Sequence, residues 1–291
     1  MKNLMRIFRT KKQQWGLVLM GGGARGLAHI GILDIFQKEG LSPDVIVGTS
    51  MGAIVGGLFS FGFSPMKLKE IMKDLNLEQF VDRPNLPFLP RRPHSILEFF
   101  LLDAYRARLQ KKIGQDKEDK LEEHFKATVG DVRIEDLPIR FACNAVDLIS
   151  GKEVIFERGE LYKALRATMS LPVVFEPVSM DDMLLVDGGV LNNVPVETAK
   201  KLGAEKTILV DIHRPLKKVS TQEINSTFQL IQRMVETMAA NTTIERIKDA
   251  DCVIRVDLDV DIFDFTSPEE LIEEGERAAR EKLAAVKKLV H

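Results

Sequence analysis

Ser50 stands at the centre of the pentapeptide Gly-Thr-Ser-Met-Gly, residues 48–52, which fits the pattern G-x-S-x-G. The β-branched run 45–47 precedes it and the apolar run 53–61 follows it, so Ser50 lies where a strand meets a helix. In such a turn Gly48 and Gly52 let the chain cross itself closely, while the serine hydroxyl projects over the sheet. Although five-residue matches of this kind also occur by chance, this context predicts a serine nucleophile.

A glycine-rich loop, also placed between a strand and a helix, precedes the serine. Its residues are Gly21, Gly22, Gly23, Ala24, Arg25 and Gly26. Its N–H groups suit a dinucleotide phosphate or a developing oxyanion. A dinucleotide site needs an acidic residue at the carboxyl end of the second strand, whereas Asp44 lies at the other end. We therefore expect an oxyanion hole at Gly22 and Gly23, and Arg25 either binds an anionic head group or ties down the loop.

Asp187 directly follows the apolar run 184–186 and is itself followed by Gly188 and Gly189. Asp-Gly is also a common surface turn, but a carboxylate at a strand end is well placed to act as a base. His213 comes later in the chain, and the order Ser, Asp, His is that of the α/β-hydrolase triad. A Ser–His–Asp esterase is therefore one alternative. The other reading gives His213 a capping or packing role, and we expect His29 to be structural.

The three motifs stand in an order that resembles the bacterial patatin-like phospholipases, relatives of plant patatin and of the catalytic domain of neuropathy target esterase. The resemblance spans residues 15–213 and includes the segment 167–178, which is similar to the family's Ser-x-Pro segment. It implies a Ser–Asp dyad of Ser50 and Asp187, with the loop 21–26 as the oxyanion hole.

The same resemblance implies an enzyme of the phospholipase A or lysophospholipase type. It would cleave fatty acyl esters of lipids through an acyl-enzyme, with neither a cofactor nor a metal. Because an aspartate of ordinary pKa, about 4, is a poor base near pH 7, we expect burial to raise the pKa of Asp187. An alternative of another class is a regulatory protein that keeps the fold without turnover.

The elements that must position these residues alternate between strand and helix, which predicts an α/β fold: three layers, α/β/α, around a mainly parallel sheet. Strands are predicted at 17–20, 45–47, 139–147, 152–157, 183–186, 207–211 and 252–258, with a hairpin turn at 150–151. Helices are predicted at 27–38, 53–61, 95–112, 161–169, 221–247 and 268–290.

Three regions follow from this pattern. Residues 1–14 form a basic tail, residues 15–213 a catalytic domain, and residues 214–291 a C-terminal part packed on the same domain. The proline-rich and charged stretch 76–130 reads as an insertion whose apolar residues either form a lid over an acyl channel or pack onto the core.

Composition and charge restrict the partners. A formal net charge of −2, with 45% hydrophobic and 29% charged residues, predicts a soluble globular protein without a general attraction for nucleic acid. Cys143 and Cys252 have no metal-ligand spacing, which indicates reduced thiols.

We expect a cytoplasmic protein whose basic tail is either solvated or makes a transient contact with a membrane surface, since no signal-peptide pattern follows the tail. The uncharged run 45–63 approaches the length of a membrane span, but its five glycines and its β-branched start favour a strand, a turn and a helix instead. The sequence leaves the oligomeric state open.

Overall fold

The computed structural model describes residues 14–74 and 120–290, except 173–174, 217, 223, 226–229, 231–232, 235–236, 238–239, 241–242, 261 and 263. The predicted basic tail up to residue 13, the predicted helix 95–112 and most of the predicted insertion 76–130 lie outside the described residues.

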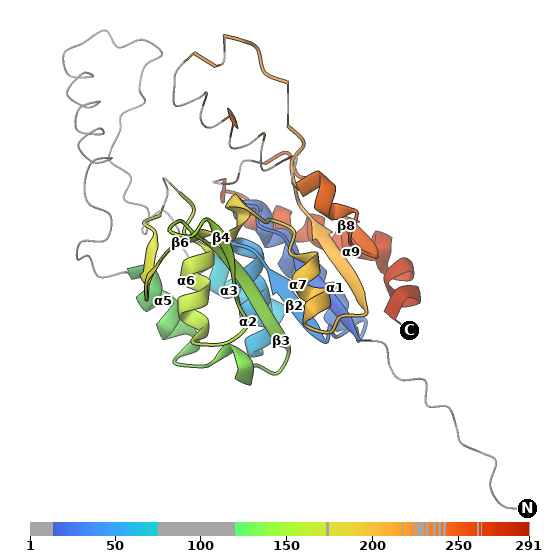
Figure 1. Cartoon of the computed structure of the whole chain (residues 1–291). Helices are drawn as coiled ribbons and strands as arrows, with labels where there is room; N and C mark the ends of the chain where they lie inside the picture. The colour runs from blue at the N-terminus through green and yellow to red at the C-terminus, as the bar shows by residue number, and fades with distance from the viewer. Residues whose placement is uncertain are drawn as a thin grey trace, which may run out of the picture.

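A single sheet dominates the described part of the chain (Figure 1). Its strands are β1 Trp15–Leu19, β2 Val45–Gly48, β3 Arg140–Asp147, β4 Lys152–Phe156, β5 Val178–Met180, β6 Met183–Asp187, β7 Lys206–Asp211 and β8 Cys252–Arg255. Their order is β5-β6-β3-β2-β1-β7-β8, with β4 also paired to β3. The pairs from β3 through β2, β1 and β7 to β8 are parallel, while β4, β5 and β6 join antiparallel. All parallel strands therefore end at one edge of the sheet, called here the carboxyl edge.

Helices connect and cover these strands. They are η1 Gly23–Leu27, α1 Ala28–Lys38, α2 Met51–Phe61, α3 Pro65–Asp74, α5 Lys120–Val129, η3 Ile134–Asp136, α6 Leu161–Thr168, η4 Gly188–Val190, α7 Val196–Lys201 and α9 Pro268–Val290. Helix α9 packs alongside α1, and the two lie side by side in Figure 1.

The alternation of side chains along β1 shows that helices cover both faces of the sheet. Gly16 faces α7, where an added Cβ would meet Ala199 and Ala204. Leu19, three residues on, points to the opposite face and contacts Gly56 of α2. The predicted three-layer α/β/α fold with a mainly parallel sheet is therefore confirmed.

The uncharged run 45–63 is divided between β2, the turn at Ser50 and the eleven-residue helix α2. Among the residues that the structure describes, no helix is both long and apolar enough to span a membrane. The strand, turn and helix predicted for this run are thus confirmed.

Two predicted elements are shorter than expected. Strand β8 ends at Arg255 rather than 258 because its partner β7 ends at Asp211, which leaves one further hydrogen bond, from the Val256 N–H to the Asp211 carbonyl (2.9 Å). The helix predicted at 221–247 does not begin at 221, since residues 221–222 form a turn; the described residues from 230 to 247 are helical up to Ile247. Helices α3, α5 and α7 and the short strand β5 were not predicted.

Glycines allow α1 and α9 to approach closely. An added Cβ on Gly31 would meet the Ile272 carbonyl oxygen and the Glu276 nitrogen, and one on Gly275 would meet the Ala28 carbonyl oxygen. These neighbours are backbone atoms, which cannot move aside as the end of a side chain can. Helix α9 therefore depends on two positions without a side chain for its contact with α1.

We expect Gly275→Ala to destabilise the protein by about 1–3 kcal/mol, because the new methyl group must push the two helix backbones apart. This loss outweighs the gain of up to about 1 kcal/mol in helix propensity. Urea unfolding measures the difference. Gly57→Ala in α2 is the control: its Cβ would meet only side-chain atoms of Leu165 and Phe141, at 3.1 Å, so its loss is smaller. Equal losses would contradict this account of the α1–α9 contact.

Candidate active site

Ser50 occupies a strained turn between β2 and α2. Its backbone angles are φ 52° and ψ −126°, in a region that residues other than glycine rarely adopt. The predicted role of Gly48 and Gly52 fits this turn. An added Cβ at Gly48 would meet the backbone of Ala53, and one at Gly52 the Leu19 carbonyl oxygen. The Ser50 N–H donates to Thr168 Oγ1 (2.9 Å). The turn therefore holds the predicted nucleophile at the carboxyl edge.

Asp187 ends β6 and lies within hydrogen-bond reach of the Ser50 hydroxyl. The register explains how two residues so distant in sequence meet. Strand β2 pairs with the first half of β3, up to Gly48 opposite Cys143, while Asp187 lies opposite Ala145, two residues further along β3. Strand β6 thus delivers its last residue to β3 just beyond the level at which β2 ends.

The Asp187 carboxyl is buried, with 3% of the residue exposed. Burial raises its pKa to about 6, while the hydrogen bonds from the Ser50 hydroxyl and the Gly189 N–H (2.7 Å) lower it by less. This shift has the direction expected from the sequence. Near neutral pH the carboxyl can be ionised and yet basic enough to take up a proton.

The glycine-rich loop lies beside the serine because β1 and β2 are parallel neighbours that end together, with Leu19 opposite Gly48. The Gly21 N–H donates to Asn193 Oδ1 (3.0 Å) and the Ala24 N–H to the Ile262 carbonyl (2.8 Å). Within the part of the chain that the structure describes, Gly22 and Gly23 make no such bond. The Arg25 Nε lies 3.4 Å from the Gly22 carbonyl oxygen, a contact that ties the loop to itself.

Asn193 joins the glycine-rich loop to the segment after Asp187. Besides accepting from the Gly21 N–H, its amide Nδ2 donates to the Gly21 carbonyl (3.0 Å), so the two groups pair through two hydrogen bonds. An added Cβ on Gly21 would meet both Asn193 Oδ1, at 2.5 Å, and Ser50 Cβ, at 3.0 Å. Asn193 therefore fixes the start of the loop directly beside Ser50.

A buried polar network supports the turn from behind. Thr49 Oγ1 donates to Asn144 Oδ1 (2.8 Å), and Asn144 Nδ2 donates to the Asn192 carbonyl (2.7 Å). Glu153 Oε1 accepts from the side-chain amides of both asparagines, at 2.7 and 2.8 Å. These bonds connect the Ser50 turn, β3, β4 and the loop after Asp187.

These features match a known family. The model of the patatin-like phospholipases matches residues 17–200, which include the glycine-rich loop, Ser50 and Asp187. The chain belongs to the patatin-like phospholipase family.

Curated relatives agree with this membership. An uncharacterized NTE family protein of Mycobacterium tuberculosis is 32% identical over 237 residues, which are 81% of this chain and 59% of that protein. The lysophospholipase NTE1 of Candida albicans is 29% identical over 211 residues, 72% of this chain and 14% of that protein. This chain thus spans about three fifths of the length of its mycobacterial relatives and a small part of the yeast proteins.

Two solved structures share the fold. VipD from Legionella pneumophila aligns with a TM-score of 0.56 at 15% identity, over 94% of this chain and 67% of VipD. ExoU from Pseudomonas aeruginosa, in its complex with SpcU, aligns with a TM-score of 0.50 at 18% identity, over 95% of this chain and 52% of ExoU.

In this patatin-like chain the histidines considered from the sequence have other partners. His213 Nδ1 pairs with Asp211 Oδ1 (2.6 Å), and Arg255 bonds both Asp211 Oδ2 (2.6 Å) and the His213 carbonyl (2.9 Å). This cluster follows β7, which β1 separates from β2. The ends of β7 and β2 are thus two strand spacings apart, about 10 Å, which separates the His213 cluster from the Ser50 turn. His29 is buried, bonds the Met20 carbonyl oxygen (2.8 Å), and has a pKa lowered to about 4 by burial.

The acidic residue considered for a dinucleotide site has a structural role. Asp44 accepts the Trp15 N–H (2.9 Å) at the start of β1, at the edge opposite Ser50. Among the described residues, no three His, Cys, Asp or Glu side chains gather as metal ligands would.

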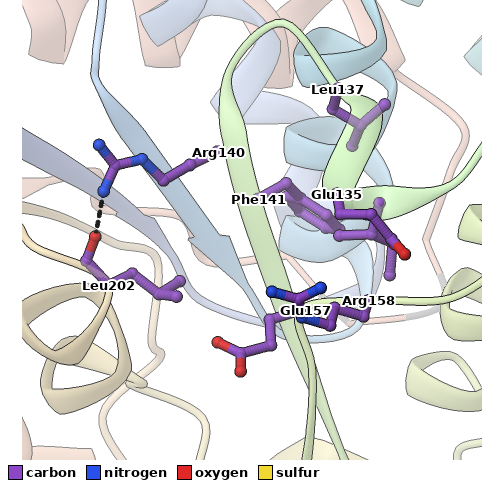
Figure 2. Close-up of a pocket in the computed structure, with 8 residues that line it drawn as sticks. Glu135, Leu137, Arg140, Phe141, Glu157, Arg158 and Leu202 are labelled. Carbon is purple, nitrogen blue, oxygen red and sulfur yellow. Dashed lines mark hydrogen bonds between the residues drawn. The ribbon is translucent and has the colours of Figure 1, made fainter.

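The structure also has a hollow of about 250 Å³, and Figure 2 shows the residues that line it. Arg140 and Phe141, at the start of β3, line it together with Glu135, Glu157 and Arg158, and Arg140 donates to the Leu202 carbonyl (2.7 Å). None of the predicted site residues lines it. The start of β3 is the edge opposite Ser50, so this hollow is separate from the candidate active site.

Sequence reasoning missed Asn193, Asn144 and Thr168, whose partners lie 172, 95 and 118 positions away. One local signal was present: the pair Asn192-Asn193 lies just after the Asp-Gly-Gly motif. Two adjacent amides in an otherwise apolar stretch are typical of a loop whose side chains bond backbone groups.

The raised pKa of Asp187 leads to a prediction for stability. Because the folded-state pKa of about 6 exceeds the ordinary value of about 4, stability is fully present below pH 4 and falls as the pH rises through 6. Two pKa units correspond to about 3 kcal/mol. We expect Asp187→Asn, which stays neutral, to raise the free energy of unfolding by about 1–3 kcal/mol at pH 8 and by less at pH 4.5, measured by urea unfolding.

Asp182→Asn, on the exposed turn between β5 and β6, is the matched control. It should leave the free energy of unfolding almost unchanged at both pH values. Equal changes in the free energy of unfolding for the two variants would show that the ionised carboxyl of Asp187 does not destabilise the folded protein.

Proposed function

We propose that this chain is a serine acyl hydrolase that cleaves fatty acyl ester bonds of lipids, as a phospholipase A or a lysophospholipase. The observation that carries the proposal is the place of the buried, high-pKa carboxyl of Asp187, which ends β6 at the Ser50 turn and interacts with the Ser50 hydroxyl. Family membership and the names of the yeast relatives support the class of substrate. In this proposal Ser50 is the nucleophile and Asp187 the general base.

The reaction follows from the geometry. Asp187 takes the hydroxyl proton as Ser50 Oγ attacks the ester carbonyl carbon, and the resulting oxyanion is stabilised by the N–H groups of Gly22 and Gly23. The protonated Asp187 then donates its proton to the leaving alcohol oxygen, which leaves an acyl group on Ser50. Water attacks this acyl-enzyme, Asp187 removes a proton from the water, and the fatty acid leaves as Ser50 Oγ is reprotonated.

Two features favour this dyad over a triad with His213. Both ring nitrogens of His213 have neighbours, Nδ1 at 2.6 Å from Asp211 Oδ1 and Nε2 at 3.1 Å from Arg255 Nη1, so neither is left for Ser50. The carboxyl of Asp187 interacts with the Ser50 hydroxyl, whereas His213 contacts Asp211 and Arg255. A dyad needs one base, and the raised pKa of Asp187 supplies it.

Variants at these residues test the assignment. Ser50→Ala and Asp187→Asn should each lower ester hydrolysis by about a thousandfold or more, while His213→Ala keeps most of the activity. Hydrolysis of a short-chain p-nitrophenyl ester measures this. Loss of activity in His213→Ala, with the fold intact by circular dichroism, would falsify the dyad.

Labelling separates this enzyme from a regulatory protein that keeps the fold without turnover. We expect a fluorophosphonate to label the wild-type protein and not Ser50→Ala, since only an activated serine attacks phosphorus at a useful rate. The wild-type protein denatured before labelling is the control. Folded wild-type protein that does not react would support the regulatory alternative.

The pH dependence provides a separate test of the base. The value of kcat/KM on the soluble ester should rise about tenfold per pH unit below 6 and level off above it, because only ionised Asp187 accepts the Ser50 proton. His213→Ala should keep the same midpoint. A midpoint that disappears in that variant would assign the titration to the histidine.

A further inference from the structure

Several large apolar side chains are exposed to solvent at the carboxyl edge of the sheet. Among the exposed large apolar side chains of the described ranges, five follow strand ends at this edge: Leu148, Ile149, Val190, Leu191 and Leu216, which we call the apolar rim. Leu148 and Ile149 form the tip of the β3–β4 hairpin and are 50% and 70% exposed. Val190 and Leu191 follow Asp187, and Leu216 follows β7. Leu148, Ile149, Val190 and Leu191 therefore come from segments next to the candidate active site, while Leu216 follows a strand that β1 separates from β2.

The hairpin tip is held rigidly in this exposed position. Asp147 Oδ1 accepts the N–H groups of Ile149 and Leu184, both at 3.0 Å, and Oδ2 accepts the N–H and the hydroxyl of Ser150 (3.0 and 2.6 Å). These bonds lower the pKa of Asp147 to about 2, so its carboxylate stays ionised. The Leu148 N–H also donates to the Leu184 carbonyl (2.8 Å). The protein thus fixes two apolar side chains away from its own core.

The tip projects past the site. Asp187 lies opposite Ala145 in β3, and the tip lies three to four residues further along the same strand. At 3.3 Å per residue, Leu148 is roughly 10 Å beyond the level of Asp187. The tip is therefore a protrusion beside Ser50 and not a part of its wall.

The charges around the rim indicate which surface it fits. The adjacent β5–β6 turn carries exposed Asp181 and Asp182, and Lys152 is an exposed cation at the hairpin. Arg214, near Leu216, pairs with Asp259 (2.6 Å). Among the described residues at the rim, cations thus do not outnumber anions, which favours apolar insertion over attraction to anionic head groups.

We propose that the apolar rim docks the protein onto a neutral, zwitterionic lipid surface, with the Leu148–Ile149 tip inserted among the acyl chains beside Ser50. The proposal rests on the proposed lipid hydrolase function, for which it names the physical form of the substrate: an assembled lipid surface and not a dissolved monomer. The tip and Ser50 lie at the same edge of the sheet, so insertion of the tip brings Ser50 to the level of the lipid esters.

Binding tests the proposal without turnover. In a Ser50→Ala background, the double variant Leu148→Ser with Ile149→Ser should bind phosphatidylcholine vesicles about tenfold more weakly in a sedimentation assay, since two inserted side chains are lost. Met66→Ser is the matched control. Met66 is 72% exposed but starts α3, which follows the end of α2 at the opposite edge, and its variant should bind unchanged.

Activity measured on two substrates separates docking from chemistry. With Ser50 restored, the tip variant should lose about tenfold in kcat/KM on phospholipid in phosphatidylcholine vesicles and keep full activity on the soluble short-chain ester. Full activity on that ester also shows that the variant is folded. A wild-type protein inactive on both substrates would contradict the proposed function, whereas the vesicle-binding result would still decide the docking proposal.

A fluorescent probe tests insertion in a protein that keeps Ser50 and does not carry the changes of Leu148 and Ile149 to serine. An environment-sensitive dye on Ile149→Cys, in a Cys252→Ser background that leaves only the buried Cys143, should shift to the blue when phosphatidylcholine vesicles are added. The same dye on Met66→Cys should not shift. Equal vesicle binding by the tip variant and the wild type, or equal shifts at both dye positions, would overturn the proposal. Binding only to vesicles rich in phosphatidylserine would overturn the choice of a neutral surface.

Discussion

Burial of a carboxyl group against a serine hydroxyl is the interaction on which the arrangement of this site depends. An aspartate loses hydration when it is buried, so Asp187 needs the hydrogen bonds from Ser50 and Gly189, and even with them its pKa stays near 6. The same loss of hydration turns a weak base into one suited to neutral pH. Stability and chemistry therefore make opposite demands on this residue.

The polar groups around Ser50 hold such a strained site in place. A serine at φ 52° persists only where the surroundings determine its conformation. Here Thr168 accepts the Ser50 N–H, and the adjacent Thr49 donates to Asn144. Asn193 extends the same support to the glycine-rich loop. Because nearly all of these groups are buried and bonded to one another, the loss of one would leave its partners without hydrogen bonds in a dry environment.

The two edges of the sheet differ in what they offer. The carboxyl edge combines the Ser50 turn, the glycine-rich loop and the apolar rim, whereas the opposite edge has the hollow at Arg140, with charged residues of both signs. A parallel sheet creates this difference, because every strand end that opens into a loop before a helix faces the same way. The Ser50 turn and the glycine-rich loop thus follow from the parallel strands, whereas Asp187 and the hairpin tip of the apolar rim come from the antiparallel strands paired to β3.

The sequence by itself determined the local features: the strand before Ser50, the glycines that its turn requires, and a carboxylate at the end of an apolar strand. Each depends on residues close together in the chain, so periodicity and turn chemistry could identify it. The mainly parallel sheet also followed, since strands that alternate with helices pair in parallel. Helix α7 has only six residues, too few for an apolar period, whereas Leu68, Ile71 and Met72 of α3 have helical spacing that the prediction overlooked.

Only the tertiary structure decided which groups meet. The pairing of β6 with the outer half of β3 puts Asp187 beside Ser50, and the fold across 172 positions brings Asn193 onto Gly21. It also left His213 with Asp211 and Arg255, although chain order alone allowed it a place in a triad. The pKa of Asp187 and the exposure of Ile149 likewise depend on what surrounds them. Burial and long-range contact are properties of the folded chain, and no local pattern of residues records them.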